Sequence, residues 1–248
     1  MTTDMYDANA EWYAALVAPW KEDTDRTLRE ALGELAGGDV IDLGSGIGSS
    51  LPVLRDLGAQ RLFAVEPSAA MRVGLMTTVA ADADLRARTT IVAGGVPDAF
   101  DQLPDTWQAA TMLNAIGHLS EEARAALWRT LAERLVPGGR FVLSLQPPAI
   151  VSDIPWTDFG TFAVGTRQLA TRGRAEVMSE THVEWEMEWS LLDADGAVLE
   201  TRSARHPWRV LTPDQLTTEA EAHGLKLLPH GGADSFLAYE LTGRVVGE

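Results

Sequence analysis

Short apolar runs alternate with segments of helical spacing through the first part of the chain. The apolar runs that we expect to be strands are residues 40–43, 62–65, 90–93, 109–113 and 141–145. Ser68 and Ser120 stand where helix N-caps are expected, and Leu127, Leu131 and Leu135 share one helical face. A strand–helix alternation of this kind predicts a parallel sheet wrapped by helices.

A different pattern follows residue 145. Residues 146–175 contain Pro147, Pro148 and Pro155 and are expected to form an irregular connection. Residues 181–191 alternate between apolar and polar side chains, which predicts a half-buried antiparallel strand. A turn at 193–196 and a returning strand at 198–210 would complete a hairpin. Thr212-Pro213-Asp214-Gln215 has capping-box spacing and precedes a helix, after which 225–228 and 236–241 form a closing hairpin.

Composition narrows the possible functions. The chain has 248 residues, 46% of them hydrophobic, and no uninterrupted apolar run long enough for a membrane span. Its N-terminus lacks the pattern of a signal peptide, so a cytoplasmic location is expected. The formal net charge of -16 disfavours nucleic-acid binding, and the absence of cysteine excludes thiolate chemistry. The histidines have no metal-binding spacing, so no metal is expected, and the oligomeric state stays open.

A glycine-rich loop follows the first expected strand. Glycines at 44, 46 and 48 allow positive φ and close approach of a ligand to the backbone. Ser49 stands where a dinucleotide-binding loop has its third glycine, and the acid Asp42 repels a pyrophosphate but suits an ammonium group. The loop therefore favours a ligand with an amino-acid tail over NAD, with a purely structural turn as the alternative.

Glu66 stands at the end of the second expected strand. A carboxylate at this position can accept two hydrogen bonds from a ribose diol, whereas an exposed acid at a strand end is the alternative interpretation. The loop and the acid occur in register with the strand order. Together they make a nucleoside ligand the favoured hypothesis.

These segments resemble the class I S-adenosylmethionine-dependent methyltransferases. The resemblance rests on Asp42-x-Gly44-x-Gly46-x-Gly48, on Glu66-Pro67-Ser68-Ala69-Ala70-Met71 and on residues 135–141. It implies an α/β fold with a Rossmann-like, doubly wound, seven-stranded sheet whose last strand is antiparallel. A small antiparallel β insertion would form a cap. The whole chain would be one domain, with a helical lid, a cofactor-binding core, a substrate cap and a closing helix and hairpin at 1–35, 36–145, 146–210 and 211–248.

The resemblance also assigns cofactor-binding residues. They are Asp42, Gly44, Ser45 and Gly46 for the methionine part, Glu66 for the ribose, Pro67 and Met71 near the adenine, and Asn114 beside the methionine tail. Apart from the resemblance, Tyr13 is a candidate to close over the cofactor, with packing of an N-terminal helix as its alternative role. The family usually has an acid after the third strand, where this chain has Gly95, so backbone contacts from Gly95 and Val96 would replace it. The usual Phe-Asp before the fourth strand is Trp107-Gln108 here.

The layout is further similar to amino-sugar and glycine N-methyltransferases, which also insert antiparallel strands after the fifth strand. The candidate substrate contacts are Tyr6, Trp185, Trp208 and Arg209. Packing of the aromatic residues and pairing of Arg209 with nearby glutamates are their alternative roles. His118 and His206 are the candidate catalytic bases. Capping of the next helix and packing within the hairpin are their alternative roles.

The sequence thus predicts an enzyme that transfers a methyl group from S-adenosylmethionine to a nitrogen or oxygen of a small metabolite. Natural-product, or antibiotic, biosynthesis is the expected setting, and an amino sugar is the preferred substrate class. The alternative is a non-methylating protein of the same fold, either a cofactor-binding protein or a cyclase that uses the covered pocket. A third hypothesis is an NAD oxidoreductase, which Asp42 and Ser49 disfavour.

Overall fold

The computed structural model describes residues 5–35 and 37–243. Its internal contacts divide the chain into two compact units. Unit 1 combines Met1–Lys21 with Pro147–Val210, and unit 2 contains the rest of the chain. The inserted segment therefore folds together with the N-terminus, and the chain after residue 210 returns to unit 2.

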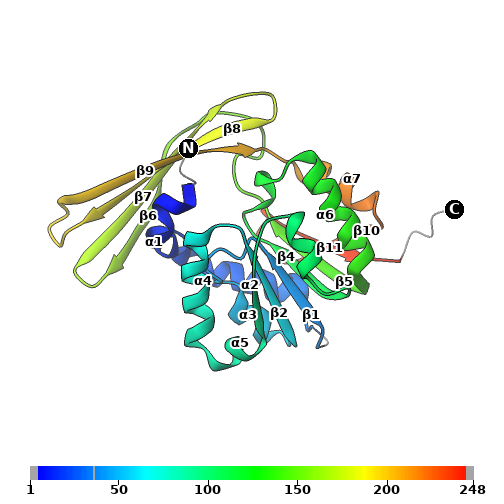
Figure 1. The fold of residues 1–248 in the computed structure, drawn as a ribbon. Helices are drawn as coiled ribbons and strands as arrows, with labels where there is room; N and C mark the ends of the chain where they lie inside the picture. Colours follow the sequence, from blue (N-terminus) through cyan, green and yellow to red (C-terminus); the bar gives the residue numbers. More distant parts are fainter. Residues whose placement is uncertain (1–4, 36, 244–248) are drawn as a thin grey trace. The chain divides into compact units, whose positions relative to one another are not determined.

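Unit 2 contains a seven-stranded sheet in the order β10-β11-β5-β4-β1-β2-β3 (Figure 1). Its strands are β1 (Asp39–Leu43), β2 (Arg61–Glu66), β3 (Thr89–Ala93), β4 (Trp107–Met112), β5 (Leu135–Ser144), β10 (Leu225–Leu228) and β11 (Phe236–Leu241). β11 is antiparallel to both neighbours, and the pairs from β5 to β3 are parallel. The predicted sheet, including its antiparallel last strand, is confirmed.

Helices cover both faces of this sheet. They are α2 (Lys21–Leu32), α3 (Leu51–Asp56), α4 (Ala69–Ala81), α5 (Ala83–Arg88), α6 (Glu121–Arg134) and α7 (Pro213–Glu221), with 3-10 turns η2 (Asp98–Gln102) and η3 (Ile116–His118). Residues of α2, α3, α4 and α5 share one apolar core, and residues of α6, α7 and η2 share the other. Because strand side chains alternate, Val40 enters the first core and Ile41 the second. No helix among the described residues is long and apolar enough to cross a membrane.

The predicted N-caps set where these helices begin. Ser68 accepts a hydrogen bond from the backbone N–H of Met71, and Ser120 accepts one from that of Ala123. Thr212 caps α7 in the same way and precedes Pro213 at the first helical position. Each hydroxyl satisfies one of the amide groups that a helix leaves unpaired at its start.

The strand order creates a switch point between β1 and β4. From β1 the chain proceeds to β2 and β3 on one side, and it then returns to β4 and β5 on the other side. The connecting helices consequently leave the sheet in opposite directions at β1 and β4. Open α/β sheets bind their ligands beyond the carboxyl ends of the strands at such a point.

Unit 1 consists of a helix packed on a four-stranded antiparallel sheet. Its elements are α1 (Met5–Val17), η1 (Ala18–Trp20), β6 (Ile154–Val164), β7 (Arg167–Val177), β8 (His182–Leu192) and β9 (Val198–Arg209). The alternation predicted for β8 is confirmed, with Val183, Trp185, Met187 and Trp189 buried on one face. Trp12 of α1 belongs to the same apolar cluster.

The other face of this sheet is charged. Glu186 of β8 pairs with Arg174 of β7 at 2.6 Å and with Arg205 of β9 at 2.9 Å. Arg202, three residues before Arg205 on β9, lies opposite Trp189, on the apolar face. Its guanidinium instead stacks 4.0 Å from the centre of the Trp12 ring. The two-residue period of a strand places Arg205 and Arg202 on opposite faces.

The expectation of an irregular connection at residues 146–175 was wrong. β6 and most of β7 lie in this range, and they pair with each other from Ile154↔Ala175 to Val164↔Arg167. β6 is an edge strand, and most of its side chains are exposed. An edge strand without a buried face carries no alternating apolar pattern, so no periodicity predicts β6.

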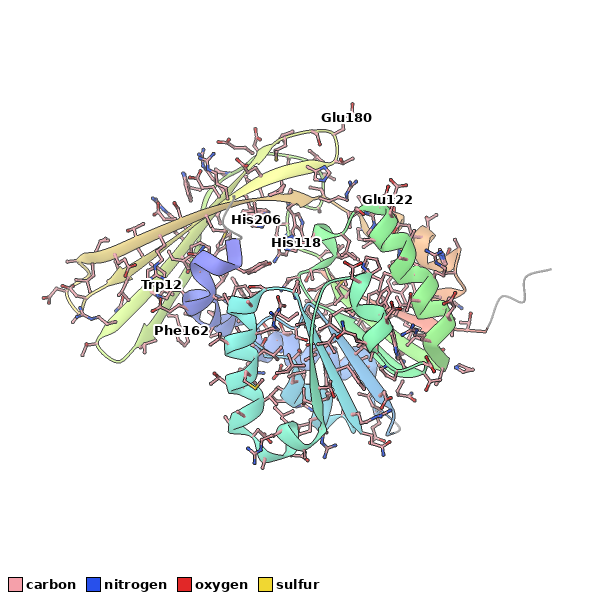
Figure 2. All side chains as sticks on the ribbon, viewed as in Figure 1. Trp12, His118, Glu122, Phe162, Glu180 and His206 are labelled. Atoms are coloured by element: carbon pink, nitrogen blue, oxygen red, sulfur yellow. The ribbon has the colours of Figure 1, made fainter. Side chains whose placement is uncertain are left out.

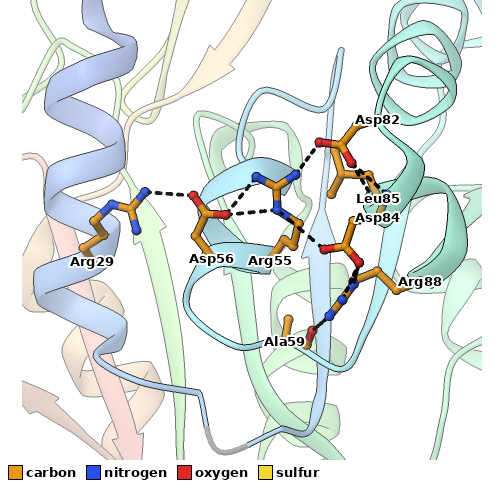
Figure 3. Close-up of polar contacts among 8 residues, drawn as sticks. All are labelled: Arg29, Arg55, Asp56, Ala59, Asp82, Asp84, Leu85 and Arg88. Carbon is orange, nitrogen blue, oxygen red and sulfur yellow. Dashed lines mark hydrogen bonds and ion pairs between the residues drawn. The ribbon is translucent and has the colours of Figure 1, made fainter.

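Two arrangements of ion pairs connect the helices of unit 2. In Figure 3, Arg55 at the end of α3 bonds to Asp56 and to Asp82 before α5, and Arg29 of α2 also reaches Asp56. These groups are largely at the surface. By contrast, Arg124 of α6 is 2% exposed and pairs with Glu219 of α7 at 3.1 Å.

Trp128 completes the buried pair by donating to Glu219 at 2.9 Å. Burial by itself would raise the pKa of Glu219, but the hydrogen bonds from Arg124 and Trp128 lower it below its usual value. The ionised form of Glu219 is therefore the one that joins α6 to α7.

Replacing Arg124 by Met should lower the free energy of unfolding by about 2–3 kcal/mol, because Glu219 would keep its charge without its cation. Since the pKa of Glu219 is lowered, this pair stabilises the fold at neutral pH and loses its effect as the pH falls through that pKa. The difference between the variant and the parent, measured by urea unfolding, should therefore shrink on acidification. Arg55→Met is the control and should cost about 1 kcal/mol or less. Equal losses of unfolding free energy in Arg124→Met and Arg55→Met would contradict the distinction between the buried ion pair and the surface ion pairs.

Candidate functional site

The glycine loop, residues 44–48, connects β1 to the turns before α3. Gly44, Gly46 and Gly48 have φ values of 74°, 57° and 80°, which side-chain-bearing residues rarely adopt. A Cβ on Gly44 would lie 2.9 Å from Cβ of Ala115, in the segment after β4. The backbone conformation thus favours glycine at all three positions, and at Gly44 the close approach of the segment after β4 requires it as well.

Hydrogen bonds hold this loop against β2 and α4. The amides of Gly44 and Ser45 both donate to the carbonyl oxygen of Val65, at 2.8 and 2.9 Å. Thr78 of α4 donates its hydroxyl to the carbonyl oxygen of Ile47 at 2.8 Å. The loop conformation is therefore fixed from two sides by the protein itself.

The carboxylate of Asp42 lies under the loop and is 2% exposed. Ser50 donates to its Oδ2 at 2.7 Å, and Thr111 of β4 donates to its Oδ1 at 2.6 Å. Burial raises the pKa of Asp42 although these hydroxyl groups act to lower it. The buried side chain of Asp42 therefore links its own strand, β1, to β4 and to the start of α3.

Glu66, the last residue of β2, orients the loop from the other side. Its Oε2 accepts from the amide of Gly46 and its Oε1 from the amide of Ser68, both at 2.8 Å. Burial is the largest influence and raises the pKa of Glu66, while these two amides lower it. Each carboxylate oxygen retains a further lone pair for a donor from a ligand.

Asn114 follows β4 at the same edge of the sheet and has a φ of 52°, in the left-handed region. Its backbone amide donates to Oγ of Ser144 at 2.8 Å, and Ser144 Oγ donates to its Oδ1 at 2.9 Å. Ser144 is the last residue of β5 and is 2% exposed. The side chain of Asn114 is consequently held by the neighbouring strand.

The other predicted cofactor residues of unit 2 lie beside these groups. Met71 is buried in the first turn of α4, and Pro67 is exposed between β2 and α4. A Cβ on Gly95 would have Cβ of Pro67 as its neighbour at 3.8 Å, so the segment with Gly95 and Val96 runs close to Pro67. The hydroxyl of Ser45 donates to the carbonyl oxygen of Asp42 and stabilises the loop.

The two candidate bases belong to different units. His118 is exposed at the end of η3, in the segment that follows β4 (Figure 2). His206 lies on β9 of unit 1, opposite Trp185, with its ring in an edge contact 6.4 Å from that of Trp208. His118 thus belongs to the edge where β4 ends, and His206 to the aromatic face of the four-stranded sheet.

The remaining predicted residues all lie in unit 1. Tyr6 and Tyr13 of α1 meet edge to face with ring centres 6.0 Å apart. Trp185 and Trp208 are buried in the apolar cluster under α1, and Trp185 donates to the carbonyl oxygen of Pro147 at 3.2 Å. Arg209 lies opposite His182, and its charge adds to burial in lowering the pKa of His182.

Sequence reasoning did not single out Ser50, Thr111 or Ser144, although they orient Asp42 and Asn114. A signal for two of them existed. Thr111 and Ser144 are polar residues near the carboxyl ends of otherwise apolar strands, which is the edge where parallel sheets place their ligands. Their partners, however, come from distant parts of the chain and become visible only in the fold.

Comparison with known proteins identifies the family. A family model described as a methyltransferase domain matches residues 19–230, so the chain belongs to the methyltransferase-domain family. The predicted class, an S-adenosylmethionine-dependent class I methyltransferase, is confirmed by this match together with the fold. Among curated proteins, no match is found.

Solved structures share the fold over nearly the whole chain. One is S-adenosylmethionine-bound CalS10, an amino pentose methyltransferase from Micromonospora echinaspora involved in calicheamicin biosynthesis. It has 19% identity and a TM-score of 0.70, with 98% of each chain covered. DesVI of Streptomyces venezuelae has 17% identity and a TM-score of 0.71, covering 96% of this chain and 99% of that one.

A third similar structure is KedS8, a sugar N-methyltransferase from Streptoalloteichus sp. It has 18% identity and a TM-score of 0.65, with 96% of this chain and 88% of that chain covered. At these identities the likeness establishes the fold alone.

Gly44→Ala should weaken binding of S-adenosylhomocysteine at least about tenfold, because the new Cβ collides with Ala115 and the backbone strain is about 1–2 kcal/mol. Gly138→Ala is a matched control, since Gly138 has a φ of 77° and nothing within 4 Å of the Cβ position. Gly138→Ala should lower the stability because of backbone strain but leave the affinity for S-adenosylhomocysteine unchanged. Calorimetry and thermal unfolding measure both effects, and normal binding by the Gly44 variant would contradict the role of the loop.

Proposed function

We propose that this protein transfers the methyl group of S-adenosylmethionine to a nitrogen or oxygen of a small metabolite. The preferred acceptor is the amino group of a sugar in natural-product biosynthesis. The observation that carries this proposal is the convergence of the glycine loop, Glu66 and Asn114 at the carboxyl ends of adjacent strands, at the switch point.

The chemistry of these groups suits the cofactor. The Glu66 carboxylate, oriented by two amides, is an acceptor for the two hydroxyl groups of a ribose. The buried acid Asp42 suits a group with hydrogen-bond donors, such as an ammonium group, and the amide of Asn114 offers donors to a carboxylate. Glycines at 44 and 46 let a ligand approach the backbone closely.

The other assigned residues complete the proposed cofactor site. Pro67 and Met71 would border the adenine, and the backbone of Gly95 and Val96 would meet its polar edge. Tyr13 would close over the cofactor from α1. Among the described residues other than its two chain neighbours, only the Cβ of Pro67 lies within 4 Å of the Cβ position of Gly95, at 3.8 Å, which supports access of a ligand to its backbone.

Two features favour an amine as the acceptor. A formal net charge of -16 attracts a cationic substrate and repels an anionic one. The fold is also shared by proteins described as an amino pentose methyltransferase and a sugar N-methyltransferase. Substrate contacts are proposed for Tyr6, Trp185, Trp208 and Arg209.

The bound cofactor would supply an electrophilic methyl group on a sulfonium. The protein would align the acceptor atom for in-line displacement and exclude water, which provides most of the catalytic help that such a reaction needs. A protonated amine has no free lone pair, so a base must first remove its proton. His118 and His206 are the candidates for this step.

The first test is calorimetric titration with S-adenosylmethionine, S-adenosylhomocysteine and NAD. Binding of the first two and none of NAD is expected, and the reverse would overturn the proposal. Amino sugars and the corresponding hydroxy sugars are then offered as acceptors, with release of S-adenosylhomocysteine as the readout. Cofactor binding without turnover on any acceptor would favour the non-methylating alternative.

Glu66→Gln should weaken S-adenosylhomocysteine binding at least about tenfold, because its NH₂ group would face an amide donor at a cost of about 1–3 kcal/mol. In the parent protein, affinity should fall as the pH decreases, because protonation removes an acceptor. This fall should begin above the usual range of a carboxyl group, since the pKa of Glu66 is raised.

The Gln variant should lack that pH dependence. Asp39→Asn provides a control at the other end of β1, where Asp39 pairs with Arg61, and it should leave affinity unchanged. Equal affinities of the parent and Glu66→Gln across the pH range would refute the assignment.

His118→Ala and His206→Ala should separate the candidate bases. The variant that lacks the base should lose about 10²–10⁴-fold in kcat while KM for the acceptor changes little. A base is needed only for the protonated acceptor, so this loss should shrink at higher pH. Small, equal effects of both substitutions on kcat would show that neither histidine is the base.

A further inference from the structure

Ser144 makes two hydrogen bonds with one residue of the proposed cofactor site. Its Oγ accepts from the backbone amide of Asn114 at 2.8 Å and donates to Asn114 Oδ1 at 2.9 Å. Ser144 is 2% exposed, so its hydroxyl proton needs an acceptor within the protein. Oδ1 is that acceptor, which determines the orientation of the Asn114 amide.

The backbone around Ser144 is itself fixed. Ser144 pairs with Phe236 of β11, and the next amide, that of Leu145, donates to the carbonyl oxygen of Ser235 at 2.8 Å. β5 therefore presents the hydroxyl group from a position that pairing with β11 restrains. Asn114, in contrast, lies beyond the end of β4, in a backbone conformation that only a few residue types adopt.

This arrangement leaves one part of the Asn114 side chain for a ligand. With Oδ1 engaged by Ser144, the NH₂ group keeps two donors, and within residues 5–35 and 37–243 it makes no hydrogen bond. An NH₂ group with two N–H donors suits a carboxylate, which accepts hydrogen bonds and donates none. Asp42, whose two carboxyl oxygens accept from Ser50 and Thr111, is the acidic group suited to the ammonium end.

We infer that Ser144 is a positioning residue that orients Asn114 so that its NH₂ group binds the carboxylate of the methionine part of the cofactor. This inference rests on the proposed function. It divides the two ends of the amino-acid tail between the strands, with the carboxylate at β4 and β5 and the ammonium group above β1.

The test measures binding of three ligands by calorimetry. They are S-adenosylhomocysteine, decarboxylated S-adenosylmethionine and methylthioadenosine, of which the last two lack the carboxylate. Ser144→Ala should weaken the binding of S-adenosylhomocysteine about tenfold or more and leave the affinities for the other two ligands nearly unchanged. Ser144→Thr, which keeps the hydroxyl group, should restore most of the affinity.

Asn114 variants test the same inference without altering β5. Asn114→Gly keeps the left-handed backbone and removes the amide, whereas Asn114→Asp keeps the acceptor for Ser144 and replaces the NH₂ donors by a negative oxygen. Both variants should lose affinity for S-adenosylhomocysteine and keep their affinity for the other two ligands. The loss should be larger for Asn114→Asp than for Asn114→Gly. In the Asn114→Gly background, Ser144→Ala should have no further effect, because the two residues act as one unit.

A purely structural role for Ser144 predicts a different result. In that case Ser144→Ala would lower the melting temperature and weaken the binding of all three ligands alike. Thr217→Ala serves as the control, because it removes a hydroxyl group that contacts Tyr239 of β11, away from the proposed site. It should reduce stability without selectivity between the ligands.

The outcomes separate this inference from the proposed function. If the parent protein binds S-adenosylhomocysteine and Ser144→Ala binds it equally well, the positioning role is overturned and the proposed function stands. Equal losses for all three ligands would also overturn it. If the parent protein binds none of them, both proposals fail.

Discussion

A buried carboxylate needs hydrogen-bond donors around it, and this requirement organises the edge of the sheet where β1 and β2 end. Asp42 and Glu66 are both removed from solvent, and burial raises the pKa of each. Their donors come from separate elements: the hydroxyl groups of Ser50 and Thr111 for Asp42, and the amides of Gly46 and Ser68 for Glu66. Satisfying the two acids therefore fixes the loop, the start of α3 and the start of α4 together.

The need to supply donors to these buried acids also explains the glycines of the loop. The chain must turn sharply after β1 if its amides are to reach Val65 and Glu66, and the turn uses positive φ at Gly44, Gly46 and Gly48. Ala115 lies so close to Gly44 that the segment after β4 is packed against this loop. The loop and that segment thus form one connected edge, to which Ser144 adds β5 through Asn114.

Unit 1 uses another principle, the alternation of side chains along a strand. One face of its sheet carries Trp185, Trp189 and Trp208 against α1, and the other carries crossed ion pairs centred on Glu186. The apolar face gives the sheet its stability, because isolated surface ion pairs contribute little. A single insertion in the chain thereby supplies an aromatic layer without interrupting the seven-stranded sheet.

Local patterns were sufficient to predict the sheet, its helix caps, the glycine loop and the alternating strand β8, because each depends on residues that are neighbours in sequence. β6 escaped prediction since an edge strand with exposed side chains has no apolar period. Contacts between distant residues, such as Thr111 with Asp42 and Ser144 with Asn114, were decided by the strand order, which places β4 beside β1 and β5. The sequence by itself determined which elements form and where a ligand loop lies. The tertiary structure decided which polar side chains orient that loop, because hydrogen bonds between strands depend on register, and register is a property of the assembled sheet.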